Sequence, residues 1–301
     1  MNMNKILSIV FLFLSFGYAS GQHFPLFSQY MFNGLVINPA FSYGYDGLTA
    51  IIDYKNQWSG SFEGAPVTLS GTLHSALKNE KISWGAIYMN DRIGLKSQND
   101  LSCNFAYRIN TGSGLLGMGI SGGFSRIRYD ASGIITTDQD DPAFAMIGSP
   151  QFYPKIGLGM YYHTEQFFAG ISAPQWLLRD SYAGVAGILA RTFFLNSGYR
   201  LDINRRLYCT PSILLRAISG SPVQTDLNIT GTLDKTITAG ISYRMYDSFV
   251  FLIHINMKSI AIGYSYDYSA GYLNKYTSGS HELMLSWRLG YGVDAPDPKR
   301  F

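Results

Sequence analysis

The sequence predicts an all-β fold, a transmembrane antiparallel β-barrel of about 14 strands. Three observations predict it. Apolar and small polar residues alternate with a period of two in about fourteen segments, the polar phase is mostly Gly, Ser, Thr and Asn, and the connections differ in length between the two rims. A soluble β-sandwich would carry Lys and Glu on its polar phase, because that phase would face water. In a barrel, the apolar phase faces lipid and the polar phase faces the lumen.

The composition and the N-terminus indicate an exported membrane protein. Charged residues make up 14% of the 301 residues and aromatic residues 15%, whereas soluble domains carry roughly 25% charged residues. Lys5, the apolar run 6–16 and the small residues at 19–21 match a secretory signal, so we expect residues 1–21 to be a signal peptide cleaved before Gln22. The run is too short for a spanning helix, which makes a retained helical anchor the weaker alternative. A net charge of +3 is too small to indicate nucleic-acid binding.

Residues 22–47 precede the first predicted strand and carry many large apolar side chains, among them Phe24, Phe32 and Phe41. A free periplasmic tail would expose these groups to water, so we expect the segment to be packed against something. It either plugs the lumen or docks a partner. The plug is the simpler hypothesis, because an internal segment closes many barrels.

The alternating segments predict a barrel over residues 48–289, followed by a periplasmic C-terminal tail at 290–301. Each segment is about ten residues long, which suits a tilted strand that crosses a bilayer. In chain order, we expect strands at 48–54, 67–75, 82–90, 98–108, 115–126, 155–163, 166–173, 189–202, 206–216, 223–233, 236–245, 248–256, 258–267 and 280–289.

The connections between these strands indicate how the barrel is oriented. Every second connection is short, whereas the others include long ones at 55–66, 127–154, 174–188 and 268–279. Short turns on one rim and long loops on the other are typical of a barrel in a bacterial outer membrane, with both termini in the periplasm. The short connection at Tyr246-Asp247 is an exception, because it falls on the long-loop side.

The inward phase of the predicted strands carries charge, whereas the outward phase is apolar. The inward charges are Arg108, Arg126, Arg216, Arg244, Arg288, Asp226, Asp267 and Glu282. They either pair with one another or line a water path, and ion pairing is the favoured interpretation. By the same alternation, Cys103 and Cys209 point outward from well-separated strands, which excludes disulfide geometry and makes them small lipid-facing groups.

The sequence offers little for catalysis, metal binding or a cofactor, and we expect none of these. The loop residues 138–141 contain three carboxylates, but they lack the regular spacing of a calcium loop and favour a solvated turn. A protease on the barrel surface would need paired acids and a His near the outer rim. His163 and His254 fall toward the other rim, so only His281 beside Glu282 keeps that hypothesis open.

Several motifs, taken together, resemble the PorP/SprF family of type IX secretion system outer-membrane proteins. The N-terminal signature comprises Phe27-Ser28-Gln29-Tyr30-Met31-Phe32-Asn33 and Ile37-Asn38-Pro39-Ala40. Further blocks follow in the family's order and cover most of the mature chain: Tyr54-Lys55-Asn56-Gln57-Trp58, Gly64-Ala65-Pro66, Asn90-Asp91-Arg92-Ile93-Gly94, Phe105-Ala106-Tyr107-Arg108 and Gly279-Ser280-His281-Glu282-Leu283-Met284-Leu285. The chain departs from the family at Gly34, where Pro is common, and at Ser59, where a bulkier residue is common.

The resemblance implies a non-enzymatic accessory barrel for the export or cell-surface attachment of large client proteins, often gliding-motility adhesins. Such a barrel is expected to engage the C-terminal domain of one client and to contact periplasmic secretion or motility machinery, within outer-membrane lipid. The long-loop rim would then hold the client. Ordinary packing within the loops is the alternative for each candidate anchor, and the candidates are Trp58, Phe62, Pro66, Phe144, Phe152, Tyr153, Trp176 and Tyr182.

Other hypotheses remain open beside this one. A transporter of hydrophobic small molecules is the main alternative, since fourteen-stranded barrels with an N-terminal plug serve that purpose. A surface protease on a barrel is the second alternative, and a soluble all-β carbohydrate-binding protein is a further one.

Overall fold

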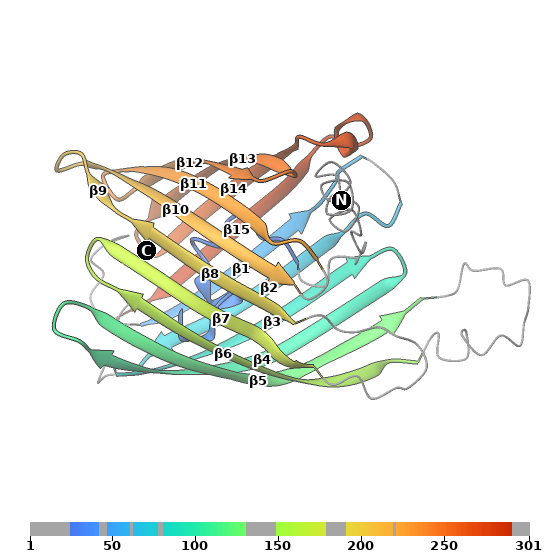
Figure 1. Ribbon diagram of the computed structural model, residues 1–301, viewed down its shortest axis with the longest axis horizontal. Coiled ribbons are helices and arrows are strands. Elements are labelled where there is room, and N and C mark those ends of the chain that lie inside the picture. Colours follow the sequence, from blue (N-terminus) through green and yellow to red (C-terminus); the bar gives the residue numbers. More distant parts are fainter. Residues whose placement is uncertain are drawn as a thin grey trace, which may run out of the picture.

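The computed structural model describes residues 25–41, 47–60, 63–77, 81–130, 149–178, 191–218 and 221–290. These residues form one antiparallel sheet of fifteen strands that closes on itself, because the first strand, β1, pairs with the last, β15, and β10 pairs with β11 (Figure 1). Strands β8 and β9 are separated by Arg200 alone and both pair with β10. They together occupy one strand position, so the barrel wall has fourteen strand positions. The predicted fold class is confirmed.

The strands lie where the alternation predicts them, with differences of a few residues at the ends. Their bounds are β1 Leu48–Asn56, β2 Val67–Ala76, β3 Ile82–Ile93, β4 Lys96–Asn110, β5 Leu115–Tyr129, β6 Gln151–His163, β7 Phe167–Leu178, β8 Thr192–Tyr199, β9 Leu201–Asp202, β10 Leu207–Ile218, β11 Gln224–Leu233, β12 Ile237–Arg244, β13 Ser248–Met257, β14 Ile260–Ser269 and β15 Ser280–Leu289.

The outer surface of the barrel is apolar and the lumen is polar. In β13, for example, Phe249, Phe251 and Ile253 are exposed, whereas Ser248 and His254 are buried. Successive side chains of a strand point to opposite faces, so this pattern places one phase on the outside and the other in the lumen. An apolar exterior of this kind fits a lipid environment.

Strands β3 to β6 are longer than predicted at the rim that carries the long loops. The apolar phase stops near Tyr88 and Leu101, but hydrogen bonding between β3 and β4 continues to the pair Ile93 and Lys96. The predicted connection of seven residues is therefore a tight turn at Gly94 and Leu95, in which Gly94 adopts a φ of 54°. Backbone pairing does not need apolar side chains, so the change of composition marks a change of surroundings and not the end of a strand.

Cys103 and Cys209 lie on the outward phases of β4 and β10 and form no disulfide. The predicted signal peptide and nearly all of the predicted C-terminal tail lie outside the described residues. Among the described residues, no helix has the length and the apolar content needed to cross a membrane.

Candidate functional site

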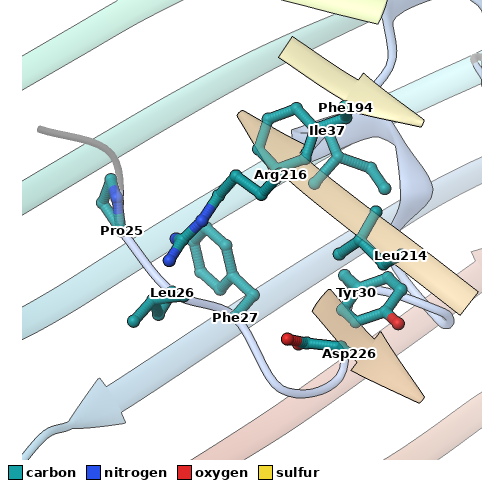
Figure 2. A pocket seen from close by; sticks show the side chains of 9 residues that line it. All are labelled: Pro25, Leu26, Phe27, Tyr30, Ile37, Phe194, Leu214, Arg216 and Asp226. Atoms are coloured by element: carbon teal, nitrogen blue, oxygen red, sulfur yellow. The ribbon is translucent and has the colours of Figure 1, made fainter. Parts of the chain in front are cut away.

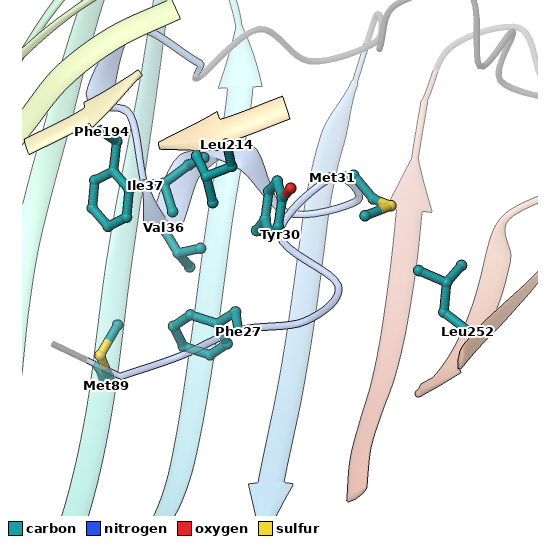
Figure 3. Packing of buried hydrophobic residues seen from close by; sticks show 9 residues of the cluster. All are labelled: Phe27, Tyr30, Met31, Val36, Ile37, Met89, Phe194, Leu214 and Leu252. Carbon is teal, nitrogen blue, oxygen red and sulfur yellow. The ribbon is translucent and has the colours of Figure 1, made fainter. Parts of the chain in front are cut away.

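Residues 25–41 lie inside the barrel (Figure 1, blue), and nearly all of them are buried. The segment contains two short 3₁₀ helices, η1 at Gly34–Val36 and η2 at Pro39–Phe41. Figure 3 shows its apolar side chains packed among inward-facing residues of several strands. That cluster consists of Phe27, Tyr30, Met31, Val36 and Ile37 from the segment, and Met89, Phe194, Leu214 and Leu252 from the wall.

The carboxylate of Glu282 holds the first part of this segment. Its two oxygens accept hydrogen bonds from the backbone N–H groups of Ser28, at 2.7 Å, and Gln29, at 2.8 Å. The amide of Gln29 also donates to the backbone carbonyl of Glu282, at 3.2 Å. Hydrogen bonds to an ionised acceptor are roughly twice as strong as neutral ones, so Glu282 fixes the position of this backbone.

Lys55 joins the segment to two carboxylates of the wall. Its Nζ lies 2.8 Å from Asp267 Oδ2, 3.1 Å from Glu282 Oε2 and 2.6 Å from the hydroxyl of Ser28. The Ser28 hydroxyl in turn donates to Asp267 at 2.7 Å. Because all four side chains are buried, each charge depends on its partners for the solvation that water would otherwise supply.

Arg244 of β12 extends this network along the wall to Asp226 of the neighbouring strand β11. Its guanidinium lies 3.1 Å from Asp226 and 3.4 Å from Asp267, and it donates a hydrogen bond of 3.5 Å to the carbonyl of Phe27. Arg216 and Asp226 line a small cavity beside residues 25–30 (Figure 2), and Arg216 donates to Gln224. Arg244, Asp226, Asp267 and Glu282 therefore all take part in ion pairs.

The second half of the segment is held mainly by neutral hydrogen bonds. Asn38 donates to the carbonyl of Met160 at 3.0 Å and accepts from the N–H of Ala40 at 2.9 Å, while the Ser172 hydroxyl donates to the carbonyl of Ile37 at 2.6 Å. The wall can approach so closely because it has no side chain at Gly119: a Cβ there would lie 2.3 Å from the backbone nitrogen of Ala40.

The N-terminal signature residues therefore face the barrel wall. In addition to Ser28, Gln29 and Asn38, Asn33 accepts a hydrogen bond from Thr72 at 3.2 Å, and Tyr30 accepts one from Asn228. Burial raises the pKa of the Tyr30 phenol above its ordinary value, so this hydroxyl stays neutral inside the barrel. Phe27 and Pro39 of the signature are buried as well.

One predicted lumen-facing charge is on the other face. Arg126 shares its phase of β5 with the exposed residues Ile120 and Phe124, whereas the buried Ser125 and Ile127 flank it. The prediction is wrong for Arg126, because strand alternation places it outside. Arg108 and Arg216 are buried on inward phases, and Arg288 is half-buried on the inward phase of β15.

The structure also contains inward charges that the sequence analysis missed. Lys55 falls in the predicted connection 55–66, but it lies in β1 and continues the inward phase of Asp53. Asp100 and Lys155 form a second buried pair, with a separation of 2.5 Å between Nζ and Oδ2. Lys55, Asp100 and Lys155 lie at or near the predicted ends of their strands. Extending the alternation of the first strand by one residue predicts the inward position of Lys55.

The candidate client anchors do not all lie in loops. Phe152 and Tyr153 belong to β6, where Phe152 is 63% exposed on the outward phase and Tyr153 is buried. Trp176 belongs to β7, is partly exposed and packs edge-on against Phe193. These predictions of a loop position are wrong, because β6 begins earlier and β7 ends later than the apolar pattern indicates.

Trp58 and Pro66 do lie in the first loop of the long-loop rim. Trp58 has a φ of 53°, and its backbone N–H donates a hydrogen bond to the hydroxyl of Ser280 at 3.1 Å. The same loop is joined to the last one by backbone hydrogen bonds between Ser59 and residues 278 and 279, while Pro66 is buried. Phe62, Phe144, Tyr182 and the acidic residues 138–141 lie outside the described residues.

The arrangement at His281 does not suit a protease. His281 lies on the outward phase of β15, where its Nδ1 is 2.7 Å from the hydroxyl of Tyr264, whereas Glu282 is buried in the lumen. The two side chains therefore lie on opposite faces of the wall. Within the described ranges, no three His, Cys, Asp or Glu side chains gather in a way that could hold a metal ion.

The closed wall, the apolar exterior and the polar, charge-paired lumen define the class of protein as a membrane β-barrel of the outer-membrane type. A family model described as "Type IX secretion system membrane protein PorP/SprF" matches residues 19–287, and the chain belongs to this family. Membership implies a component of the type IX secretion system that interacts with secretion machinery and cargo. Family and fold together support an outer-membrane location and are consistent with a non-enzymatic role.

Comparison with solved structures gives the same fold at low sequence identity. The chain is similar to a Pseudomonas aeruginosa FadL homologue, with 13% identity, a TM-score of 0.51, and coverage of 90% of this chain and 96% of that one. It is also similar to a deletion mutant of TodX, a monoaromatic hydrocarbon channel, with 12% identity, a TM-score of 0.50, and coverage of 86% and 94%. The comparison with curated proteins found no match.

Proposed function

We propose that this barrel supports the secretion or cell-surface anchoring of a client protein, such as a gliding-motility adhesin, by binding protein and without catalysing a reaction. The observation that carries this proposal is where the family signature lies. Residues 27–39 lie in the lumen, and their polar groups form hydrogen bonds with the wall at Glu282, Asp267 and the backbone carbonyl of Met160. Because the family signature is buried against the inner wall, it favours a plug. The rim then remains as the surface for a partner.

The buried ion pairs support a permanent plug. Removing residues 25–41 from the lumen would leave Glu282, Asp267 and Arg244 with fewer partners inside the barrel, which is costly for buried charges. The client would then not pass through this lumen. It would bind outside it, and the periplasmic machinery would contact the opposite rim.

We place the long loops outside the cell and both termini in the periplasm, as the loop lengths favour. A cysteine-labelling experiment tests this orientation. In a background with Cys103→Ser and Cys209→Ser, Gly271→Cys should react in intact cells with a maleimide that cannot cross membranes, and Asn204→Cys should not. Labelling of Asn204→Cys alone would reverse the orientation.

The long-loop rim offers a surface for the client. The first and last loops of this rim are tied together at Ser59 and residues 278–279, and Trp58 and Trp176 lie at the rim. Large aromatic side chains concentrate binding energy at interfaces. We propose Trp58 and Trp176 as anchors for the C-terminal domain of the client.

A transporter of hydrophobic small molecules is the alternative, and the fold shared with the FadL homologue and the TodX channel favours it. The two functions differ in what the barrel lets through. Planar-bilayer conductance and uptake of an aromatic hydrocarbon by cells should be absent for a client anchor, and a steady flux would favour the transporter.

The first experiment compares surface and medium proteomes of cells with and without the gene, and captures the wild-type complex by an affinity tag. Loss of one large exported protein that also co-purifies with the barrel would support the proposal. Trp58→Ala with Trp176→Ala should lose that protein, whereas Trp287→Ala, a 53% exposed tryptophan near the other rim, should keep it. An unchanged exported set with nothing bound would overturn the proposal.

A further inference from the structure

The outward face of β3, β4 and β5 changes from apolar to polar along one sharp line. Strand register places Tyr88, Leu101 and Phe124 side by side in the last apolar row. The next outward row consists of Asn90, Asn99 and Arg126, and the row after that of Arg92, Ser97 and Arg128. These three strands lie side by side in the wall (Figure 1). They thus present two polar rows directly beyond their apolar surface.

This patch of six residues is strongly cationic. It contains three guanidiniums, at Arg92, Arg126 and Arg128, and no acidic side chain. Asp91 points to the opposite face, where Thr68 donates a hydrogen bond of 2.7 Å to it. Asp130 follows Arg128 on the outward phase, so one carboxylate borders three positive charges.

The patch lies at the depth expected for lipid headgroups. On β4, the outward residues from Ile109 to Leu101 are apolar, and all but Cys103 are large. This stretch covers roughly 27 Å along the strand and about 20 Å along the membrane normal at a tilt of about 45°, close to the height of the apolar band of membrane barrels. The rows that follow Leu101 therefore begin where the hydrocarbon region ends.

Hydrogen bonds fix the side chains at this boundary. The Oδ1 atom of Asn99 accepts hydrogen bonds from the hydroxyl of Tyr88 and from the amide of Asn90, each at 2.9 Å. Phe152 of β6 pairs with Arg126 and borders the patch, and its ring centroid lies 6.3 Å from that of Phe124. The polar rows are thus framed by aromatic side chains that suit the interface of a bilayer.

We propose that Arg92, Arg126 and Arg128 bind the phosphate groups of a lipopolysaccharide molecule in the outer leaflet, whose acyl chains lie against Tyr88, Leu101 and Phe124. The proposal rests on the orientation given under the proposed function, because that orientation places these strand ends in the outer leaflet. Arginine suits the ligand, since its planar fork of N–H groups matches the oxygens of a phosphate.

The opposite part of the wall has no equivalent patch. At the same rim, the outward residues near the ends of β12, β13 and β14 are Tyr243, Phe249, Tyr266 and Tyr268, with no Lys or Arg among them. The cations are therefore a local feature of β3 to β5 and not a property of the whole rim. A local cationic patch predicts a bound lipid at one position around the barrel.

The test measures binding of lipid A that carries both phosphates to the full-length protein in detergent. We compare wild type with Arg92→Gln/Arg126→Gln/Arg128→Gln, and with Arg205→Gln/Lys235→Gln/Lys258→Gln, which removes three charges from turns at the other rim. Exposed ion pairs are individually weak, so the first triple variant should bind about tenfold more weakly while the control binds as wild type does. Lipid A without phosphates should bind wild type and the first triple variant with the same low affinity.

Three results would overturn the proposal: equal loss in both triple variants, equal binding of lipid A with and without phosphates, or equal affinity for phosphatidylglycerol, which would indicate a general response to anionic lipid. Loss of the client with unchanged lipid binding in the first triple variant would assign the patch to protein recognition instead. Because the detergent assay contains no client, a failure of the proposed function leaves its outcome unaffected.

Discussion

Two arginines of this barrel, Arg244 and Arg126, have opposite surroundings. Arg244 is buried in the lumen within 3.6 Å of Asp226, Asp247 and Asp267. Arg126 lies outside, between Asn99 and Phe152 of the neighbouring strands. The comparison shows that strand phase, and not residue type, decides what a charge does here. Inside, charges pair and hold the N-terminal segment, whereas outside they are available to the membrane.

Removing the charge of each arginine tests the difference between the two sites. Arg244→Gln should destabilise the barrel by about 3–5 kcal/mol, because it leaves buried carboxylates without their cation. Arg126→Gln should change stability by no more than about 0.5 kcal/mol, as exposed substitutions usually do. Urea unfolding in detergent, followed by tryptophan fluorescence, measures both. Equal effects would mean that the two sites do not differ in burial.

A smaller effect is expected at the contact between Glu282 and the segment. Glu282→Gln should weaken the hydrogen bonds to the N–H groups of Ser28 and Gln29 by roughly 1.5–3 kcal/mol, since the acceptor loses its charge. Hydrogen exchange of these two amides should then become about 10–100 times faster, as measured by mass spectrometry. Glu165→Gln, at an exposed turn, is the matched control. Unchanged exchange would show that Glu282 does not hold the segment.

The fold follows from the sequence because each strand carries its own alternation, and this local signal survives without knowledge of neighbours. The phase is hard to read where both faces carry small side chains, as at Ser121 to Gly123, which is why the prediction is wrong for Arg126. Phe124, the large residue that follows, gives the true phase. The contacts that hold residues 25–41 inside the barrel do not follow from the sequence in the same way. Ser28 and Glu282 are 254 residues apart, and nothing local to either residue encodes their contact.

Gly119 and Gly122 lie on opposite faces of β5, so the same substitution at each position tests how closely each face is packed. Gly119→Ala should destabilise the barrel by about 1–3 kcal/mol, because the added Cβ would lie 2.3 Å from the backbone of Ala40 and displace helix η2. Gly122→Ala on the outward phase of the same strand is the control, since no atom lies within 4 Å of its added Cβ. Urea unfolding distinguishes them, and an equal response would argue against close packing of the segment.

The smallest effect concerns a pair outside the membrane-spanning wall, where water weakens the interaction. In the turns at the short-turn rim, Arg206 Nε donates to Asp234 Oδ1 at 2.7 Å, and this hydrogen bond lowers the pKa of the Asp234 carboxyl below its ordinary value. A lowered pKa contributes stability above the unfolded pKa of about 3.9 and loses it as pH falls through the folded value. The unfolding midpoint of wild type should therefore slightly exceed that of Asp234→Asn at about pH 7, and the two should converge as the pH falls through the lowered pKa of Asp234 in the folded protein. A difference that grows on acidification would contradict the ion pair and would assign the effect to the shape of the turn.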